Sequence, residues 1–216
     1  MDFHAQFDYG RSLAGEYIAS FAFPWQALTG LNGFLYALGA TLNREYVAVK
    51  EGVWVHESAV VAPSALLLPP CVICAGAQVR HGAFLRGGVS VGRNCVAGNS
   101  VELKNCVLFD GAQVPHFNYV GDSILGYRAH LGAGAITSNV RLDKRGVAVR
   151  GEAVWQTGLK KFGALIGDGA EIGCNAVLNP GCVIGKGALV LPLASVRGVV
   201  EEGRVVKRDG AVAIRK

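Results

Sequence analysis

The chain has 216 residues and a formal net charge of +5, with 51% hydrophobic and only 17% charged residues. This composition excludes a disordered protein, because such chains carry high charge and little apolar surface to bury. The 30 glycines follow no Gly-X-Y period, which excludes collagen. Together with many Val, Ile and Ala residues they predict short extended segments joined by tight turns. The length suits one domain with a small appendage.

The N-terminal quarter contains an uncharged stretch from residue 17 to residue 43. Large apolar side chains recur in it at steps of three and four, at Trp25, Leu28, Leu31, Leu35, Leu38 and Leu42. This spacing predicts an amphipathic helix that begins near Pro24 and docks on the protein's own body. A membrane span, which is apolar all round, is not predicted. We therefore expect residues 1–52 to form a helical appendage.

An apolar residue returns every six positions from Val55 onward, with two interruptions. The members of this series are Val55, Val61, Leu67, Ile73, Val79, Leu85, Val91, Ala97, Leu103, Phe109, Tyr119, Leu125, Leu131, Ile166, Ile172, Leu178, Ile184, Val190 and Val196. Four places after each member stands Ala, Cys, Ser or Val, with one exception. A six-residue period predicts one short strand and one corner per unit, and three units per triangular coil. The sequence therefore predicts an all-β fold, a parallel β-helix over residues 53–200.

Three of the six cysteines, Cys71, Cys95 and Cys182, occupy the small-residue position of the repeat. We expect them to pack inside as small apolar side chains. Cys71 and Cys74 lack a second matching pair, so their spacing does not predict a zinc site. No secretory signal is recognised at the N-terminus, where Asp2 stands in place of a basic region. Reduced, packed thiols without an export signal indicate the cytoplasm.

The first interruption of the repeat, between Phe109 and Tyr119, places His116 on a predicted corner loop. Interruptions release side chains from packing, so they are natural places for a functional site. Histidine is well suited to accept a proton near neutral pH. One interpretation is therefore a catalytic base, which Glu102 could orient, and the other is a hydrogen-bonded structural histidine.

Two basic residues, Arg86 and Lys104, each follow a member of the apolar series and are 18 residues apart, one full coil. They should therefore lie directly above one another on one edge of the prism. Stacked like charges are unfavourable unless solvated or shared by an anion. A phosphate group is the simplest such anion, and a solvated pair is the alternative.

The second interruption, from about residue 137 to residue 165, is strongly basic and predicts an extended arm or small hairpin. It is long enough to reach a neighbouring subunit. Residues 201–216 form a basic tail, which either is solvated or contacts a phosphorylated ligand; its cations are Arg204, Lys207, Arg208, Arg215 and Lys216. Basic and aromatic residues do not alternate in the body of the chain, so nucleic-acid binding is not predicted.

Two segments beside the interruptions resemble a known family. They are Val114-Pro115-His116-Phe117-Asn118-Tyr119-Val120-Gly121-Asp122 and Leu131-Gly132-Ala133-Gly134-Ala135-Ile136-Thr137-Ser138-Asn139. Over about residues 53–200 the chain resembles hexapeptide-repeat acyltransferases. Within these it resembles the C-terminal acetyltransferase domain of the bifunctional glucosamine-1-phosphate N-acetyltransferase/N-acetylglucosamine-1-phosphate uridylyltransferase, without the uridylyltransferase domain.

This resemblance implies a left-handed β-helix, a homotrimer and transfer of acetyl from acetyl-CoA to an amino-sugar phosphate such as glucosamine-1-phosphate, a step toward UDP-N-acetylglucosamine. No metal is implied. The family's catalytic base falls on His116. Its sugar-phosphate-binding residues fall on Arg86, Lys104, Tyr119, Asn139 and Lys161, and its acetyl-CoA site falls near Ala133 and Cys174.

The chain departs from the family's bacterial members at His130, Val140 and Cys174. These departures motivate a second hypothesis, a non-catalytic sugar-phosphate or sugar-nucleotide binder that partners a separate nucleotidyltransferase. A third hypothesis is a metal-dependent hydratase of the carbonic-anhydrase type, which would need His81, His116 and His130 to converge.

Overall fold

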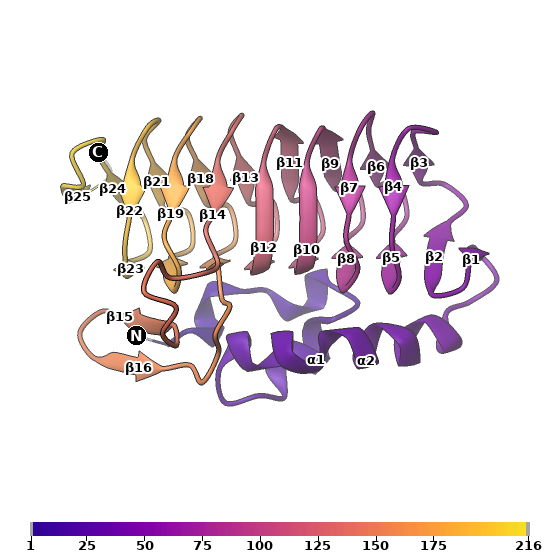
Figure 1. The fold of residues 1–216 in the computed structure, drawn as a ribbon, viewed down its shortest axis with the longest axis horizontal. Coiled ribbons are helices and arrows are strands. Elements are labelled where there is room, and N and C mark those ends of the chain that lie inside the picture. The colour runs from indigo at the N-terminus through magenta and orange to yellow at the C-terminus, as the bar shows by residue number, and fades with distance from the viewer. Residues whose placement is uncertain (1, 215–216) are drawn as a thin grey trace.

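The computed structural model describes residues 2–214, and these form a β-solenoid of about nine turns with helices along one side (Figure 1). The predicted fold class is confirmed. Each coil contributes strands to three flat faces that meet at three corners, and neighbouring coils pair in parallel. Arg215 and Lys216 of the predicted tail lie outside the described residues.

The first face is a separate sheet of parallel strands. Its members are β3 (Val60–Val61), β6 (Gln78–Val79), β9 (Val96–Asn99), β11 (Gln113–His116), β13 (His130–Leu131), β18 (Glu171–Ile172), β21 (Leu189–Val190) and β24 (Arg204–Val206). The antiparallel β25 (Val212–Ile214) closes the C-terminal end of this sheet. The coil thus continues beyond the expected residue 200, and two short strands lie within the predicted basic tail.

The second and third faces share the two long strands β10 (Glu102–Leu108) and β12 (Tyr119–Leu125), which bend from one face into the other. On the second face they join β4 (Leu66–Leu67), β7 (Phe84–Leu85), β14 (Ile136–Thr137), β19 (Val177–Leu178) and β22 (Ser195–Val196). On the third face they join β2 (Val53–His56), β5 (Cys71–Ile73), β8 (Val89–Val91), β17 (Ala164–Ile166), β20 (Cys182–Ile184) and β23 (Val199–Val200). The antiparallel β1 (Tyr46–Lys50) caps the N-terminal end.

The interior of the prism is filled by one continuous core of Val, Leu, Ile, Ala and Cys side chains. Cys71, Cys95 and Cys182 are buried in this core, as expected, and all six cysteines are free. Burial of such side chains contributes roughly 1.5–3 kcal/mol each for the larger ones. Because one coil alone cannot cover its own interior, the coils are stable only when stacked.

The repeat slips by one residue at the first interruption, and here two sequence expectations are wrong. Leu108 and Val120 occupy the interior in place of the expected Phe109 and Tyr119, which face outward. The coil is one residue short, since His116 is in register with Asn99, 17 residues earlier. His116 therefore ends strand β11 at an ordinary corner and not on a projecting loop.

The N-terminal segment covers the third face (Figure 1). Its helical elements are the short η1 (His4–Gln6), η2 (Tyr9–Arg11) and η3 (Pro24–Gln26), with α1 (Gly15–Ala19) and the longer α2 (Ala27–Thr41). The helix predicted to begin near Pro24 is thus present. Its buried residues Leu28, Leu31 and Leu35 pack with side chains that point outward from the third face, such as Val72 and Val107.

A buried carboxylate fastens the start of the chain to the coil. Asp168 accepts hydrogen bonds from the backbone N–H groups of Asp8 and Tyr127, both at 2.7 Å. The side chain of Gln6 accepts another from the N–H of Lys186 at 2.9 Å. Burial raises the pKa of Asp168 above its ordinary value, and the two N–H donors oppose this shift.

The arm leaves the coil after β14 and returns at β17, and it carries the hairpin β15 (Ala148–Arg150) and β16 (Val154–Gln156). It packs on the N-terminal segment of its own chain, where the ring centroid of Trp155 lies 5.0 Å from that of Phe3. Phe3 also contacts Trp25 at 5.0 Å. The arm and the helices are therefore held together by one aromatic cluster.

Candidate functional site

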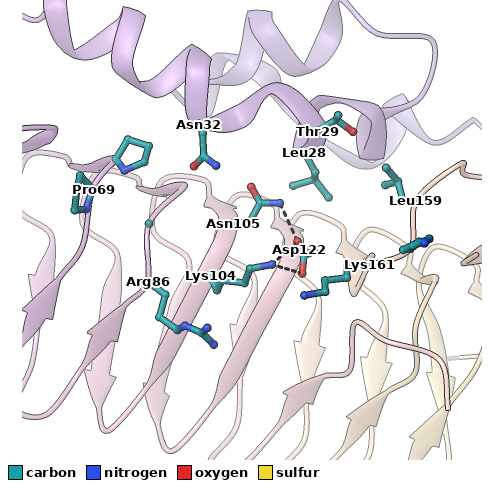
Figure 2. Close-up of a pocket in the computed structure, with 13 residues that line it drawn as sticks. Leu28, Thr29, Asn32, Pro69, Arg86, Lys104, Asn105, Asp122, Leu159 and Lys161 are labelled. Carbon is teal, nitrogen blue, oxygen red and sulfur yellow. Dashed lines mark hydrogen bonds and ion pairs between the residues drawn. The ribbon is translucent and has the colours of Figure 1, made fainter. Parts of the chain in front are cut away.

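A pocket of about 380 Å³ lies at the corner between the second and third faces, beneath α2 and beside the arm (Figure 2). Four of its lining side chains are cationic, and one is a carboxylate. The lining residues are Leu28, Thr29, Asn32, Pro69, Pro70, Arg86, Gly87, Lys104, Asn105, Asp122, Leu159, Lys160 and Lys161. Helix, coil corner and arm, which are far apart in sequence, thus each supply a wall.

Arg86 and Lys104 lie on adjacent coils at this corner, as their spacing predicted, since the N–H of Arg86 donates to the carbonyl of Leu103. Each cation has a carboxylate partner from this chain. Lys104 Nζ is 3.0 Å from one oxygen of Asp122 and 3.1 Å from the other. Arg86 donates to Glu102 at 2.7 Å. The repulsion between the stacked cations is therefore already balanced, and an external anion is not required to keep them together.

Asp122 is the centre of the polar network, and the sequence reasoning missed it. Its side chain is only 5% exposed, and it accepts hydrogen bonds from Asn105 and Asn139 as well as from Lys104. Asn139 also donates to the Tyr119 hydroxyl at 3.1 Å. Burial raises the pKa of Tyr119, so its phenol keeps its proton near neutral pH and can donate it to a ligand.

Lys160 and Lys161 bring further positive charge from the arm. Both are exposed, and within residues 2–214 neither has an ion-pair partner. Lys161 extends toward Lys104 and Asp122 in the close-up (Figure 2). Because their charge is not balanced by a carboxylate of the chain, the arm lysines make the pocket attractive to an anion.

His116, Ala133 and Cys174 share another corner, the one between the first and second faces. Backbone hydrogen bonds link them from coil to coil: the N–H of Gly134 donates to the carbonyl of His116 at 3.0 Å, and the N–H of Asn175 to that of Ala133 at 2.8 Å. The residues predicted to be the catalytic base and to form the acetyl-CoA site therefore lie in one row along this corner, the His116 ridge. His116 and Cys174 are exposed on it.

The predicted site residues therefore fall into two groups on opposite edges of the second face. Arg86, Lys104 and Lys161 line the pocket, and Tyr119 and Asn139 reach it through Asp122. His116 does not line the pocket. The Glu102 carboxylate, suggested to orient His116, accepts from Arg86 through one of its oxygens, and its role toward His116 stays a prediction.

Other candidate chemistry is weaker. Within residues 2–214, no group of three or more His, Cys, Asp or Glu side chains is placed to hold a metal ion. His130 instead lies on the first face, where its Nδ1 is 2.7 Å from the carboxylate of Glu171. Burial raises the pKa of the Cys74 thiol to about 11, so it is not a ready nucleophile.

In the described part of the chain, no helix is long and apolar enough to cross a membrane.

Comparisons with known proteins identify the repeat. A family model described as the GMPPB C-terminal domain matches residues 67–159, and one described as bacterial transferase hexapeptide (six repeats) matches residues 163–198. The fold and these matches define the chain as a hexapeptide-repeat protein.

Two similar proteins are named as bifunctional. The bifunctional protein GlmU of Methanococcus maripaludis is 31% identical over 197 residues, 89% of this chain and 48% of that protein. The bifunctional sugar-1-phosphate nucleotidylyltransferase/acetyltransferase of Sulfurisphaera tokodaii is 38% identical over 112 residues, 51% of this chain and 28% of that protein. The resemblance drawn from the sequence to hexapeptide-repeat acyltransferases is confirmed. The chain spans about half the length of the first relative and a smaller part of the second.

A solved structure of the acetyltransferase domain of PglB from Neisseria gonorrhoeae in complex with acetyl coenzyme A matches 73% of this chain and 55% of that chain. The identity is 21% and the TM-score 0.27. A likeness of this degree does not bear on function.

Proposed function

We propose that the chain is an acetyl-CoA-dependent N-acetyltransferase that acts on an amino-sugar phosphate such as glucosamine-1-phosphate. The observation that carries this proposal is the pocket in which Arg86, Lys104 and Lys161 lie together although the chain brings them from two coils and the arm. A cationic pocket of this size on a fold with sugar acetyltransferase relatives suits a phosphorylated sugar.

The long side chains of Arg86 and Lys104 hold the phosphate over the edge of the second face. The sugar lies on this face, and its amine, on the carbon next to the one that carries the phosphate, is turned toward the His116 ridge. This face is only three to four residues wide, roughly 10–13 Å at the rise of a β-strand. Tyr119 lies between the two edges and offers its hydroxyl to the sugar. The residues on opposite edges of the face are thus joined by one substrate.

At the ridge, the amino nitrogen of the sugar attacks the thioester carbonyl of acetyl-CoA. The new bond joins carbon to nitrogen, the carbon–sulfur bond breaks, and CoA leaves as its thiol. His116 accepts the proton that the amine loses, a role worth roughly 10²–10⁴-fold in rate. Ala133 and Cys174, beside His116 on the ridge, contact the acetyl-CoA, and no metal takes part.

The assembly that we propose is a homotrimer in the cytoplasm. The third face is covered by α2 and the arm, whereas the first and second faces carry exposed apolar side chains such as Val60 on the first and Ile136 on the second. A second copy that covers the second face also encloses the substrate and excludes water from the thioester.

The test is a CoA-release assay with glucosamine-1-phosphate and related amino-sugar phosphates. We expect His116→Ala to lower kcat by about 10²–10⁴-fold while the Kd of acetyl-CoA stays unchanged. His81→Ala is the matched control, because His81 is exposed at the same corner two coils away and should leave the rate unaltered.

An unchanged rate in His116→Ala would remove the catalytic base from the proposal. Binding of glucosamine-1-phosphate without release of CoA thiol by the unaltered protein would instead indicate the non-catalytic binder. Retention of full CoA release after metal removal is expected, and it would dismiss the metal-dependent hydratase.

A further inference from the structure

The helix α2 forms a wall of the cationic pocket as well as covering the coil. Leu28 and Asn32 are four residues apart and so lie on one side of the helix. Leu28 is buried against the coil, whereas Asn32 is exposed and points down from the helix into the pocket (Figure 2). The N-terminal segment therefore contributes a polar side chain to a site otherwise built from the coil and the arm.

Asn32 comes unusually close to the coil backbone. Its carboxamide oxygen lies 2.7 Å from the point where a Cβ on Gly88 would stand. Gly88 has φ of +63°, and it follows Gly87, whose own Cβ would meet the carbonyl oxygen of Pro69 at 2.4 Å. Two successive glycines at this corner thus leave the space that the helix and Asn32 occupy.

A second carboxamide faces the same point. The side-chain oxygen of Asn105 lies 3.1 Å from the position of that absent Cβ. One N–H of the Asn105 amide donates to Asp122 at 2.9 Å, and this identifies the side-chain oxygen that faces Asn32 as an acceptor. Within residues 2–214 no hydrogen bond to the Asn32 side chain is found. The two carboxamides therefore form a pair that can accept from and donate to a ligand.

The pair lies beside the cations but is itself uncharged. Arg86 and Lys104, which are adjacent in sequence to Gly87 and Asn105, serve the charged group of a ligand. Carboxamides suit its neutral hydroxyl groups, since they both donate and accept. No aromatic side chain lines the pocket among the described residues, so a nucleobase would find no ring on which to stack.

We propose that Asn32 is an acceptor-specificity residue, whose carboxamide, together with that of Asn105, binds the hydroxyl groups at the end of the sugar remote from its amine, while the cations hold its phosphate. This inference rests on the proposed function for the identity of the ligand. It gives the N-terminal helix a direct part in choosing the acceptor.

The test is calorimetric binding of two probes, glucosamine-1-phosphate and inorganic phosphate, to the full chain and to Asn32→Ala. We expect Asn32→Ala to weaken glucosamine-1-phosphate binding about five- to tenfold, as the loss of one neutral hydrogen bond does. The affinity for inorganic phosphate should not change, because the cations are untouched. Thr41→Ala, an exposed polar residue at the far end of the same helix, should alter neither.

Three results would overturn the inference: an equal loss for both probes, no loss for either, or no binding of glucosamine-1-phosphate to the unaltered chain. An equal loss would mean that Asn32 only supports the position of the cations. The CoA-release assay keeps the two proposals apart. If the chain binds the sugar phosphate but releases no CoA, the proposed function fails while the Asn32 comparison remains valid.

Discussion

The two ion pairs beside the pocket have the same chemistry but different surroundings. The side chains of Lys104 and Asp122 are 25% and 5% exposed, whereas those of Arg86 and Glu102 are 46% and 33% exposed. A buried charge that loses its partner is costly, while an exposed ion pair contributes little because water and salt screen it. The same type of substitution should therefore have very different effects at the two pairs.

We expect Asp122→Asn to lower the free energy of unfolding by about 2–4 kcal/mol, because Lys104 would keep its charge without a counter-charge. Glu102→Gln, the matched variant at the exposed pair, should leave the free energy of unfolding nearly unchanged. Urea-induced unfolding followed by circular dichroism measures both. Equal losses in the two variants would show that burial does not distinguish the pairs.

The residues of the pocket also show how far the sequence could predict the site. The 18-residue spacing of Arg86 and Lys104 correctly places them on adjacent coils. The next coil is one residue short, so Lys104 is in register with Gly121, and the spacing does not single out Asp122, the carboxylate partner of Lys104. Asn32 had no such signal, because its place in the pocket depends on how the helix docks, which no local spacing encodes.

At the scale of single elements, α2 packs one side against the coil and exposes the other side to solvent. Gly39 is buried against the coil, whereas Gly33 is exposed. A Cβ on Gly39 would stand 2.4 Å from the ring of Trp54, whereas a Cβ on Gly33 would meet nothing within 4 Å. Gly39 therefore allows the close approach of the helix to β2, and Gly33 has no such role.

We expect Gly33→Ala to raise the free energy of unfolding by about 0.5–1 kcal/mol, since alanine favours the helix over glycine. Gly39→Ala gains the same propensity but forces Trp54 aside, and overpacking of this kind costs about 1–3 kcal/mol. Thermal unfolding of both variants gives the comparison. A higher Tm for Gly39→Ala than for the unaltered chain would contradict the packing of α2 on Trp54.

The spacing of apolar residues predicted α2 and the strands of the coil correctly wherever only one large apolar side chain in each repeat unit could face the core. The helix stripe at Leu28, Leu31 and Leu35 and the six-residue series both meet this condition. At the first interruption Leu108 and Phe109 are both large and apolar, so hydrophobicity alone could not show which one turns inward. Only the pairing of whole coils settles that choice, because the shorter coil turns Leu108 inward in register with Val91 and leaves Phe109 outside.

At the scale of the whole molecule, the three faces are unequal. The third is covered by helices and arm. On the second, register aligns one outward row from coil to coil; its members are Leu66, Phe84, Glu102, Tyr119, Ile136, Val177 and Ser195. This row is mostly apolar, and it crosses the space between the His116 ridge and the cationic pocket. A surface of this kind on a rigid prism suits another copy of the chain.

We expect Ile136→Glu to convert the proposed trimer to monomers at micromolar concentration, because it would bury an unpaired carboxylate at the centre of the row. Ile136 is 37% exposed in the single chain, so the substitution leaves the fold intact. Leu142→Glu is the matched control, since Leu142 is 98% exposed and belongs to the arm, not to the strands that form this row. Light scattering coupled to size exclusion gives the masses. A monomeric unaltered chain, or a trimer that persists in Ile136→Glu, would place the contact between copies elsewhere or remove it.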